Sequence, residues 1–144
     1  MPNNDTFHAA FRGNFTGLLS WQQLDEFWKL VQRKADAGWY IYAIGTPVPA
    51  RQSSTEDVKK FIAEVNTLLH AEHYEDYCGI VYTDSKEDPA FIKIFDPNNL
   101  GASCGFSNHP PLPGWILSLI PPQPLEPRRP LPAGRQRWWQ NLWA

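Results

Sequence analysis

Side chains able to bind a metal are concentrated between residues 70 and 78, where two histidines, three carboxylates and a thiol occur: His70, Glu72, His73, Glu75, Asp76 and Cys78. Histidines three residues apart lie on one face of a helix, and a carboxylate from the following loop can complete a tetrahedral site. The spacing matches neither His-Glu-x-x-His nor Cys-x-x-Cys. The helix dipole also favours histidines in a last turn without any metal. We therefore expect no metal or other cofactor, and His70, His73 and Asp76 are the candidate ligands if a metal binds.

Cys104 is a second candidate for chemistry, because Gly101 and Gly105 lie close to it and His109 follows five residues later. A thiol in a glycine-rich turn can be exposed, and a histidine placed nearby by the fold lowers the pKa of such a thiol. A thiol-dependent or metal-assisted enzyme would then use Cys104 and His109, with His73 as a further catalytic candidate. The same glycines are equally expected in a tight turn that has no catalytic role.

The segment from Asp96 to Gly114 is an unusually long irregular stretch that follows the most strand-like part of the chain. Connections longer than about 12 to 15 residues without secondary structure are uncommon in compact domains unless they are functional or disordered. Its prolines stand beside Trp115, a combination that a partner protein can bind. Because no catalytic fingerprint of high specificity occurs, we expect a non-enzymatic protein-interaction module that uses the 96–115 loop. The candidate binding residues are Asn98, Asn99, Cys104, Phe106, His109 and Trp115.

Hydrophobic periodicity indicates the elements that must position these residues. Apolar side chains at helical spacing predict one helix that begins after Ser20 and ends at Gly38, and a second over residues 54–71. Runs of apolar and aromatic residues predict strands, at residues 39–44, 77–83 and 90–95. The order helix, strand, helix, strand, strand predicts a two-layer α+β domain, in which two helices pack on a small mixed sheet of three to four strands. The strand–helix–strand step favours a parallel crossover, and the last two strands favour a hairpin.

The second helix carries the clearest local signals. Ser53 and Glu56 form a capping-box pair at its start. Phe61, Ile62 and Val65 lie on the face that we expect to pack on the sheet. Later in the chain, the apolar run at residues 115–120 is too short for periodicity to distinguish a fourth strand from a helical turn.

The composition indicates a globular protein of one domain, with 144 residues, 42% of them hydrophobic and 19% charged. A formal net charge of −2 gives no reason to expect nucleic acid or an anionic membrane as the main partner. The two cysteines, Cys78 and Cys104, are too few for a disulfide framework, so we expect free thiols, with one bridge between them as the alternative. The first twenty residues lack a basic start followed by an apolar run, which favours a cytoplasmic location.

The chain divides into a partly ordered lead-in (residues 1–18), a single α+β domain (residues 19–120) and a disordered tail (residues 121–144) that is rich in Pro, Arg and Trp. Six prolines between residues 121 and 132 disfavour helix and strand in this tail. Four arginines against one glutamate give the tail a net charge of +3, which leaves −5 for the preceding residues. We expect an unknown protein partner and no membrane, and a nucleic-acid partner only through residues Arg128–Trp143.

Four stretches resemble segments of small uncharacterised bacterial proteins: Ala37–Tyr42, Asp76–Tyr82, Ile94–Gly101 and Pro111–Trp115. The resemblance covers roughly Ser20 to Pro122 and stops before the arginine-rich tail. It implies a bacterial protein family without an assigned activity. Because the tail departs from it, a strain-specific or frameshifted extension after Leu125 is one alternative and a native tail is the other.

Overall fold

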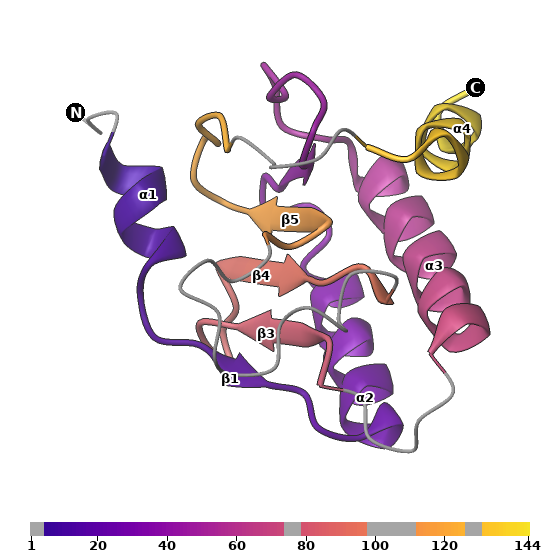
Figure 1. The fold of residues 1–144 in the computed structure, drawn as a ribbon. Helices are drawn as coiled ribbons and strands as arrows, with labels where there is room; N and C mark the ends of the chain where they lie inside the picture. Colours follow the sequence, from indigo (N-terminus) through magenta and orange to yellow (C-terminus); the bar gives the residue numbers. More distant parts are fainter. Residues whose placement is uncertain (1–4, 74–78, 98–111, 126–130) are drawn as a thin grey trace, which may run out of the picture.

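The computed structural model describes residues 5–73, 79–97, 112–125 and 131–144, and these form four helices and five strands (Figure 1). In chain order the elements are α1 (Asp5–Phe11), β1 (Thr16–Gly17), α2 (Trp21–Arg33), β2 (Tyr40–Ala43), α3 (Thr55–Glu72), β3 (Val81–Thr83), β4 (Phe91–Ile94), β5 (Trp115–Ser118) and α4 (Ala133–Leu142). The predicted α+β class is confirmed. Within the described residues, no helix has both the length and the apolar character that crossing a membrane requires.

The five strands form one sheet in the order β1-β3-β4-β5-β2, and every neighbouring pair is antiparallel. The predicted mixed sheet of three to four strands is therefore wrong in detail. The parallel crossover through α3 does not occur, because β5 pairs with β4 on one side and with β2 on the other. The predicted hairpin of β3 and β4 is confirmed.

Strand β5 resolves the alternative between a strand and a helical turn at residues 115–120. All four of its residues are buried, as expected for a strand that has a paired neighbour on each side. Trp115 and Leu117 belong to one core cluster, whereas Ile116 belongs to a second cluster on the opposite face. Because side chains alternate along a strand, β5 contributes to the core on both faces of the sheet.

Helices α2 and α3 supply the larger core cluster on one face of the sheet. The predicted start of α2 after Ser20 is confirmed, and Ser20 is its N-cap, because Ser20 Oγ accepts a hydrogen bond from the Gln23 backbone N–H at 3.1 Å. In α3 the N-cap is Ser54 rather than the predicted Ser53, and it accepts from the Asp57 N–H at 3.1 Å. The predicted packing face of α3 is confirmed, with Phe61, Ile62 and Val65 at most 1% exposed.

Helix α1 lies on the other side of the sheet, a position that the sequence pattern did not predict (Figure 1). Phe7 of α1 is 1% exposed, and its ring lies 5.3 Å from the ring of Phe91 and 6.5 Å from the ring of Tyr42. Together with Ile44 and Ile116 these residues form the second core cluster. The arrangement is thus three-layered where α1 covers the sheet, not two-layered.

Helix α4 lies beside α3, within the part of the chain that was predicted to be a disordered tail (Figure 1). Pro132 immediately precedes α4, and residues 133–144 contain no proline. Proline therefore does not prevent these residues from forming a helix. Leu142 is 5% exposed, and the Trp138 ring lies 5.3 Å from the ring of Trp115. Residues 133–142 thus depart from the predicted tail, whereas residues 126–130 lie outside the described ranges.

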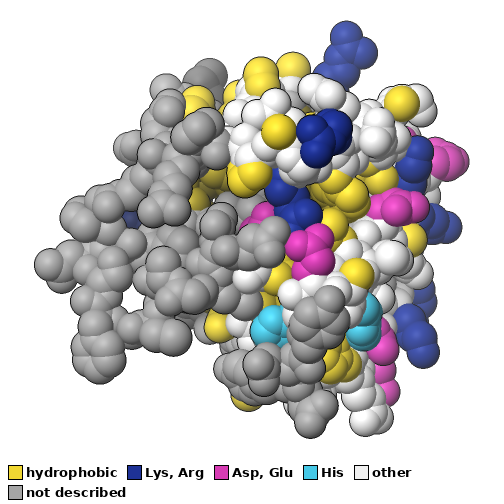
Figure 2. Space-filling view, turned by 45° about the vertical axis from the view of Figure 1, so that its right-hand side comes forward, with side chains coloured by type: hydrophobic (Ala, Val, Ile, Leu, Met, Phe, Trp, Pro, Cys, Tyr) yellow, Lys and Arg dark blue, Asp and Glu magenta, His cyan; other side chains and the backbone are white. Residues whose placement is uncertain are grey.

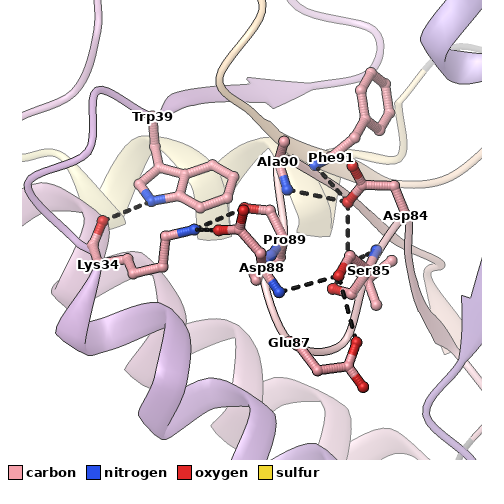
Figure 3. Close-up of polar contacts among 10 residues, drawn as sticks. Lys34, Trp39, Asp84, Ser85, Glu87, Asp88, Pro89, Ala90 and Phe91 are labelled. Atoms are coloured by element: carbon pink, nitrogen blue, oxygen red, sulfur yellow. Dashed lines mark hydrogen bonds and ion pairs between the residues drawn. The ribbon is translucent and has the colours of Figure 1, made fainter.

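The loop between β3 and β4 is fixed by side-chain hydrogen bonds (Figure 3). The Asp84 carboxylate Oδ1 accepts from the backbone N–H groups of Ala90 and Phe91, both at 3.0 Å. Lys34, which follows α2, forms a 2.6 Å ion pair with Asp88 in the same loop. These contacts define the path of the loop and connect it to the end of α2.

Candidate functional site

Most residues predicted for thiol chemistry or for partner binding lie outside the described residues: Asn98, Asn99, Cys104, Phe106 and His109. Asp76, the candidate carboxylate ligand, and Cys78 lie outside them as well. The hypotheses of a nucleophilic Cys104 and of a bridge between the two cysteines therefore stay predictions. The described residues do define how the 96–114 segment is attached to the fold.

The two described candidate metal ligands, His70 and His73, pack against the same tryptophan, Trp21 of α2. The His70 ring stacks on the Trp21 ring at a centroid distance of 4.0 Å, and the His73 ring lies 5.9 Å away. Within the described ranges, no group of three or more His, Cys, Asp or Glu side chains is placed to hold a metal ion. Figure 2 shows histidine side chains on a face where acidic and basic side chains lie close together. Both histidines thus pack on an aromatic ring of α2, and His70 Nε2 also lies 3.8 Å from the Asp25 carboxylate of that helix.

The two ends of the 96–114 segment are fixed to each other. The Gly114 backbone N–H donates to the carbonyl of Ile94 at 2.8 Å, and Ile94 is the residue of β4 that pairs with Trp115. A Cβ atom at Gly114 would lie 3.3 Å from the Cβ of Asp96, so only glycine permits this close approach without displacement. Trp115, a predicted binding residue, is 3% exposed, so it anchors the segment in the core.

Arg135 of α4 holds the Asp96 end of the segment through a buried cluster that we call the Arg135 clamp (Arg135, Asp96 and Glu72). Nε and Nη2 of Arg135 donate to the two Asp96 carboxylate oxygens at 2.7 and 2.9 Å. Nη1 and Nη2 donate to the two Glu72 oxygens at 3.0 and 2.7 Å. Arg135 is 9% exposed and Asp96 is 6% exposed. The clamp thus joins α4, the end of α3 and the start of the 96–114 segment.

The hydrogen bonds of the clamp, foremost those to Asp96, raise the pKa of Arg135 above its ordinary value although burial acts in the opposite direction. The planar guanidinium suits this position because it can donate to two carboxylates in parallel pairs of hydrogen bonds. Sequence reasoning missed Arg135, although a signal for it exists. Arg135, Trp138, Trp139 and Leu142 follow the i, i+3, i+4, i+7 spacing of a helix face.

On the opposite face of the sheet, Lys93 of β4 lies between two aromatic rings. Its Nζ is 4.0 Å from the ring centroids of both Phe11 and Phe15, and it donates to the Phe11 carbonyl at 2.7 Å. That carbonyl belongs to the last residue of α1, where the helix dipole favours a cation. Burial lowers the pKa of Lys93 from 10.5 to about 8, and the two ring faces oppose this shift because they stabilise the ammonium form. Lys93 therefore joins α1 to the sheet through a cation whose charge is lost at moderately alkaline pH.

We expect the stability of the protein relative to a Lys93→Met variant to rise with pH. The pKa in the folded state, about 8, is below the unfolded value of 10.5. Between these values the unfolded chain binds the proton that the folded chain has released, so deprotonation stabilises the fold. Urea denaturation of both proteins at intervals from pH 7 to pH 10.5 measures the trend, and Lys60→Met on the exposed side of α3 corrects for the loss of a lysine. A difference that stays constant with pH would contradict the lowered pKa.

No protein-family model, curated protein or solved structure matches this chain. Function must therefore be inferred from the contacts of the chain itself.

Proposed function

We propose that this chain is a cytoplasmic, non-enzymatic protein that binds another protein through the 96–115 loop. The described ends of the loop support this role. Asp96 accepts a hydrogen bond from Arg135 of α4, and the Gly114 N–H donates to Ile94 of β4. Trp115 acts in this proposal as an anchor that fixes the end of the loop, since its side chain is buried. In this proposal, residues between Asp96 and Gly114 contact the partner directly.

The observation that carries the proposal is the pairing register of β4 and β5. Ile94 pairs with Trp115, so twenty residues, 95–114, connect two strands that are already adjacent. Antiparallel neighbours need a connection of only about two to five residues. The fold therefore does not require most of this segment, and a role in recognition explains why it is present.

Both ends of the 96–114 segment are hydrogen-bonded to the rest of the fold, and this attachment favours binding of a partner. The Gly114 N–H donates to the Ile94 carbonyl, and the Ile44 N–H donates to the Gly114 carbonyl at 3.0 Å, so Gly114 is bonded to the last residue of β4 and to the residue that follows β2. The Arg135 clamp fixes Asp96 with two further hydrogen bonds. Fixing both ends lowers the conformational entropy that the segment loses when it binds, which favours affinity.

Shortening the segment tests the proposal. Residues 98–111 are replaced by about four Gly and Ser residues, a length typical of hairpin connections, while Asp96, Pro97 and residues 112–114 are kept. Because the anchors remain, we expect thermal melting and the NMR dispersion of core residues to be preserved. The partner is identified by affinity capture with the intact chain, then purified and titrated by calorimetry. We expect its affinity for the shortened chain to fall at least about tenfold, or about 1.4 kcal/mol.

The matched control is the double substitution Lys59→Ser and Lys60→Ser on the exposed side of α3, which should leave the affinity unchanged. Cys104→Ser separates the proposal from thiol catalysis, because it abolishes thiol chemistry, whereas binding that is shared among several loop residues should fall by less than in the shortened chain. A folded shortened chain that binds every captured partner as tightly as the intact chain would refute the proposal.

A further inference from the structure

A shallow groove of about 520 Å³ lies along α2, next to the loop between β3 and β4. Its apolar lining comes from Leu18, Phe27 and Leu30. Three cations surround these residues, and they are Lys29, Arg33 and Lys86. Glu26 is the one carboxylate among the described lining residues, which gives the groove a net charge of +2. This sign is opposite to the net charge of −5 that residues 1–120 carry together.

The three cations of the groove have no carboxylate partner within 4.0 Å in the described part of the chain. Neighbouring Lys34 differs, because it forms a 2.6 Å ion pair with Asp88. Lys29, Arg33 and Lys86 are all exposed. Like-charged side chains that converge on one groove repel each other, and an anionic ligand would relieve that repulsion.

The groove is built on elements whose positions are fixed. Lys29 and Arg33 are four residues apart on α2, so they lie on the same side of that helix. Lys86 lies in the loop that Asp84 and the Lys34–Asp88 ion pair hold against the end of α2 (Figure 3). The three charges therefore come from two elements that are already bonded to each other.

We propose that this groove binds an acidic peptide segment of a partner protein. The cations would bind its carboxylates, and Leu30, which is half-buried, would contact an apolar side chain of the peptide, since Leu18 and Phe27 are at most 4% exposed. Nucleic acid fits less well, because the described lining presents no exposed aromatic ring on which a base can stack. The groove is independent of the 96–115 loop, since Lys86 precedes β4 and Asp96 follows it, at the opposite end of the strand.

Titration with designed peptides tests this proposal. The probe is a fluorescein-labelled peptide that alternates glutamate with leucine, and its counterpart has glutamine in place of each glutamate. Fluorescence anisotropy should show the glutamate peptide binding at least about tenfold more tightly at low salt, because surface charges attract strongly only when salt does not screen them. In NMR titrations of the full chain, the largest amide shifts should map to α2 and the β3–β4 loop.

The decisive variant combines Lys29→Gln, Arg33→Gln and Lys86→Gln, which removes the cations but keeps side chains of similar length. We expect it to bind the glutamate peptide at least about tenfold more weakly, since each exposed ion pair contributes about 0.2 to 1 kcal/mol. Lys59→Gln with Lys60→Gln on α3 serves as the matched control and should bind like the original chain. Thermal melting verifies that both variants are folded.

Three results would overturn the proposal. One is equal affinity for the glutamate and glutamine peptides, and another is unchanged affinity in the decisive variant. The third is tighter binding of a single-stranded oligothymidylate that displaces the peptide, which would assign the cations to nucleic acid instead.

Discussion

Replacing Arg135 with alanine should lower the free energy of unfolding by about 3 to 5 kcal/mol, the range expected when one partner of a buried ionic cluster is removed. Asp96 and Glu72 both accept hydrogen bonds from Nη2 of Arg135, so the variant would leave two neighbouring carboxylates without the cation between them. Glu72 can turn toward solvent, because its side chain is 31% exposed, whereas that of Asp96 is only 7% exposed. Urea denaturation followed by tryptophan fluorescence measures the loss.

Arg137→Ala is the matched control, because Arg137 is exposed on the same helix and should change stability by no more than about 0.5 kcal/mol. The stability of the Arg135→Lys variant should lie between those of Arg135→Ala and Arg137→Ala. An ammonium keeps the positive charge but cannot donate parallel pairs of hydrogen bonds to both carboxylates. Adding Asp96→Asn to Arg135→Ala should recover part of the loss by removing the buried negative charge. Equal stability of the Arg135→Ala and Arg137→Ala variants would show that the clamp contributes nothing measurable.

Phe61→Ala should also cost about 3 to 5 kcal/mol, because the ring is 0% exposed at the centre of the α3 packing face. The substitution removes a large apolar side chain and leaves a cavity that rigid neighbours fill only in part. It also removes the edge-to-face contact with Trp139 of α4, whose ring lies 6.2 Å away at 82°. The loss is measured as a shift of the urea midpoint at constant slope.

Lys60→Ala, on the neighbouring exposed position of α3, is the control and should be nearly neutral. A double-mutant cycle with Trp139→Ala isolates the ring contact, for which we expect a coupling of about 0.5 to 1.5 kcal/mol. A nearly neutral Phe61→Ala would mean that α3 does not pack on the sheet through this face. A coupling energy of zero would mean that the ring contact between Phe61 and Trp139 does not stabilise the protein, even if Phe61 packs in the core.

The elements that could be predicted from the sequence are those whose signals are local. Helices α2 and α3 carry apolar stripes and side-chain caps, and a single long helix needs little else to be identified. The direction and order of the strands depended on β5, four residues whose partners lie more than twenty residues away on one side and more than seventy on the other. No local pattern contains that information, so the expected parallel pairing was wrong.

The candidate site could be predicted in part. The length of the 96–114 segment is visible in the sequence, but its anchoring is not, because Asp96 and Arg135 are 39 residues apart. The same limit applies to His70 and His73, since the stacking surface they share, Trp21, belongs to another helix. Local spacing suggested metal ligands there, and it gave no sign that both rings pack on Trp21. The groove on α2 likewise needs Lys86 from a distant loop.

The position of β5 between β4 and β2 has a consequence for biosynthesis. A nascent chain that has not yet released residues 115–118 from the ribosome has β4 and β2 without the strand that joins them. The three-stranded part β1-β3-β4 would then have an unpaired edge at β4, and β2 would have no strand partner, a state that is prone to aggregation and that chaperones bind. Cooperative folding of the sheet must therefore wait until most of the chain has been synthesised.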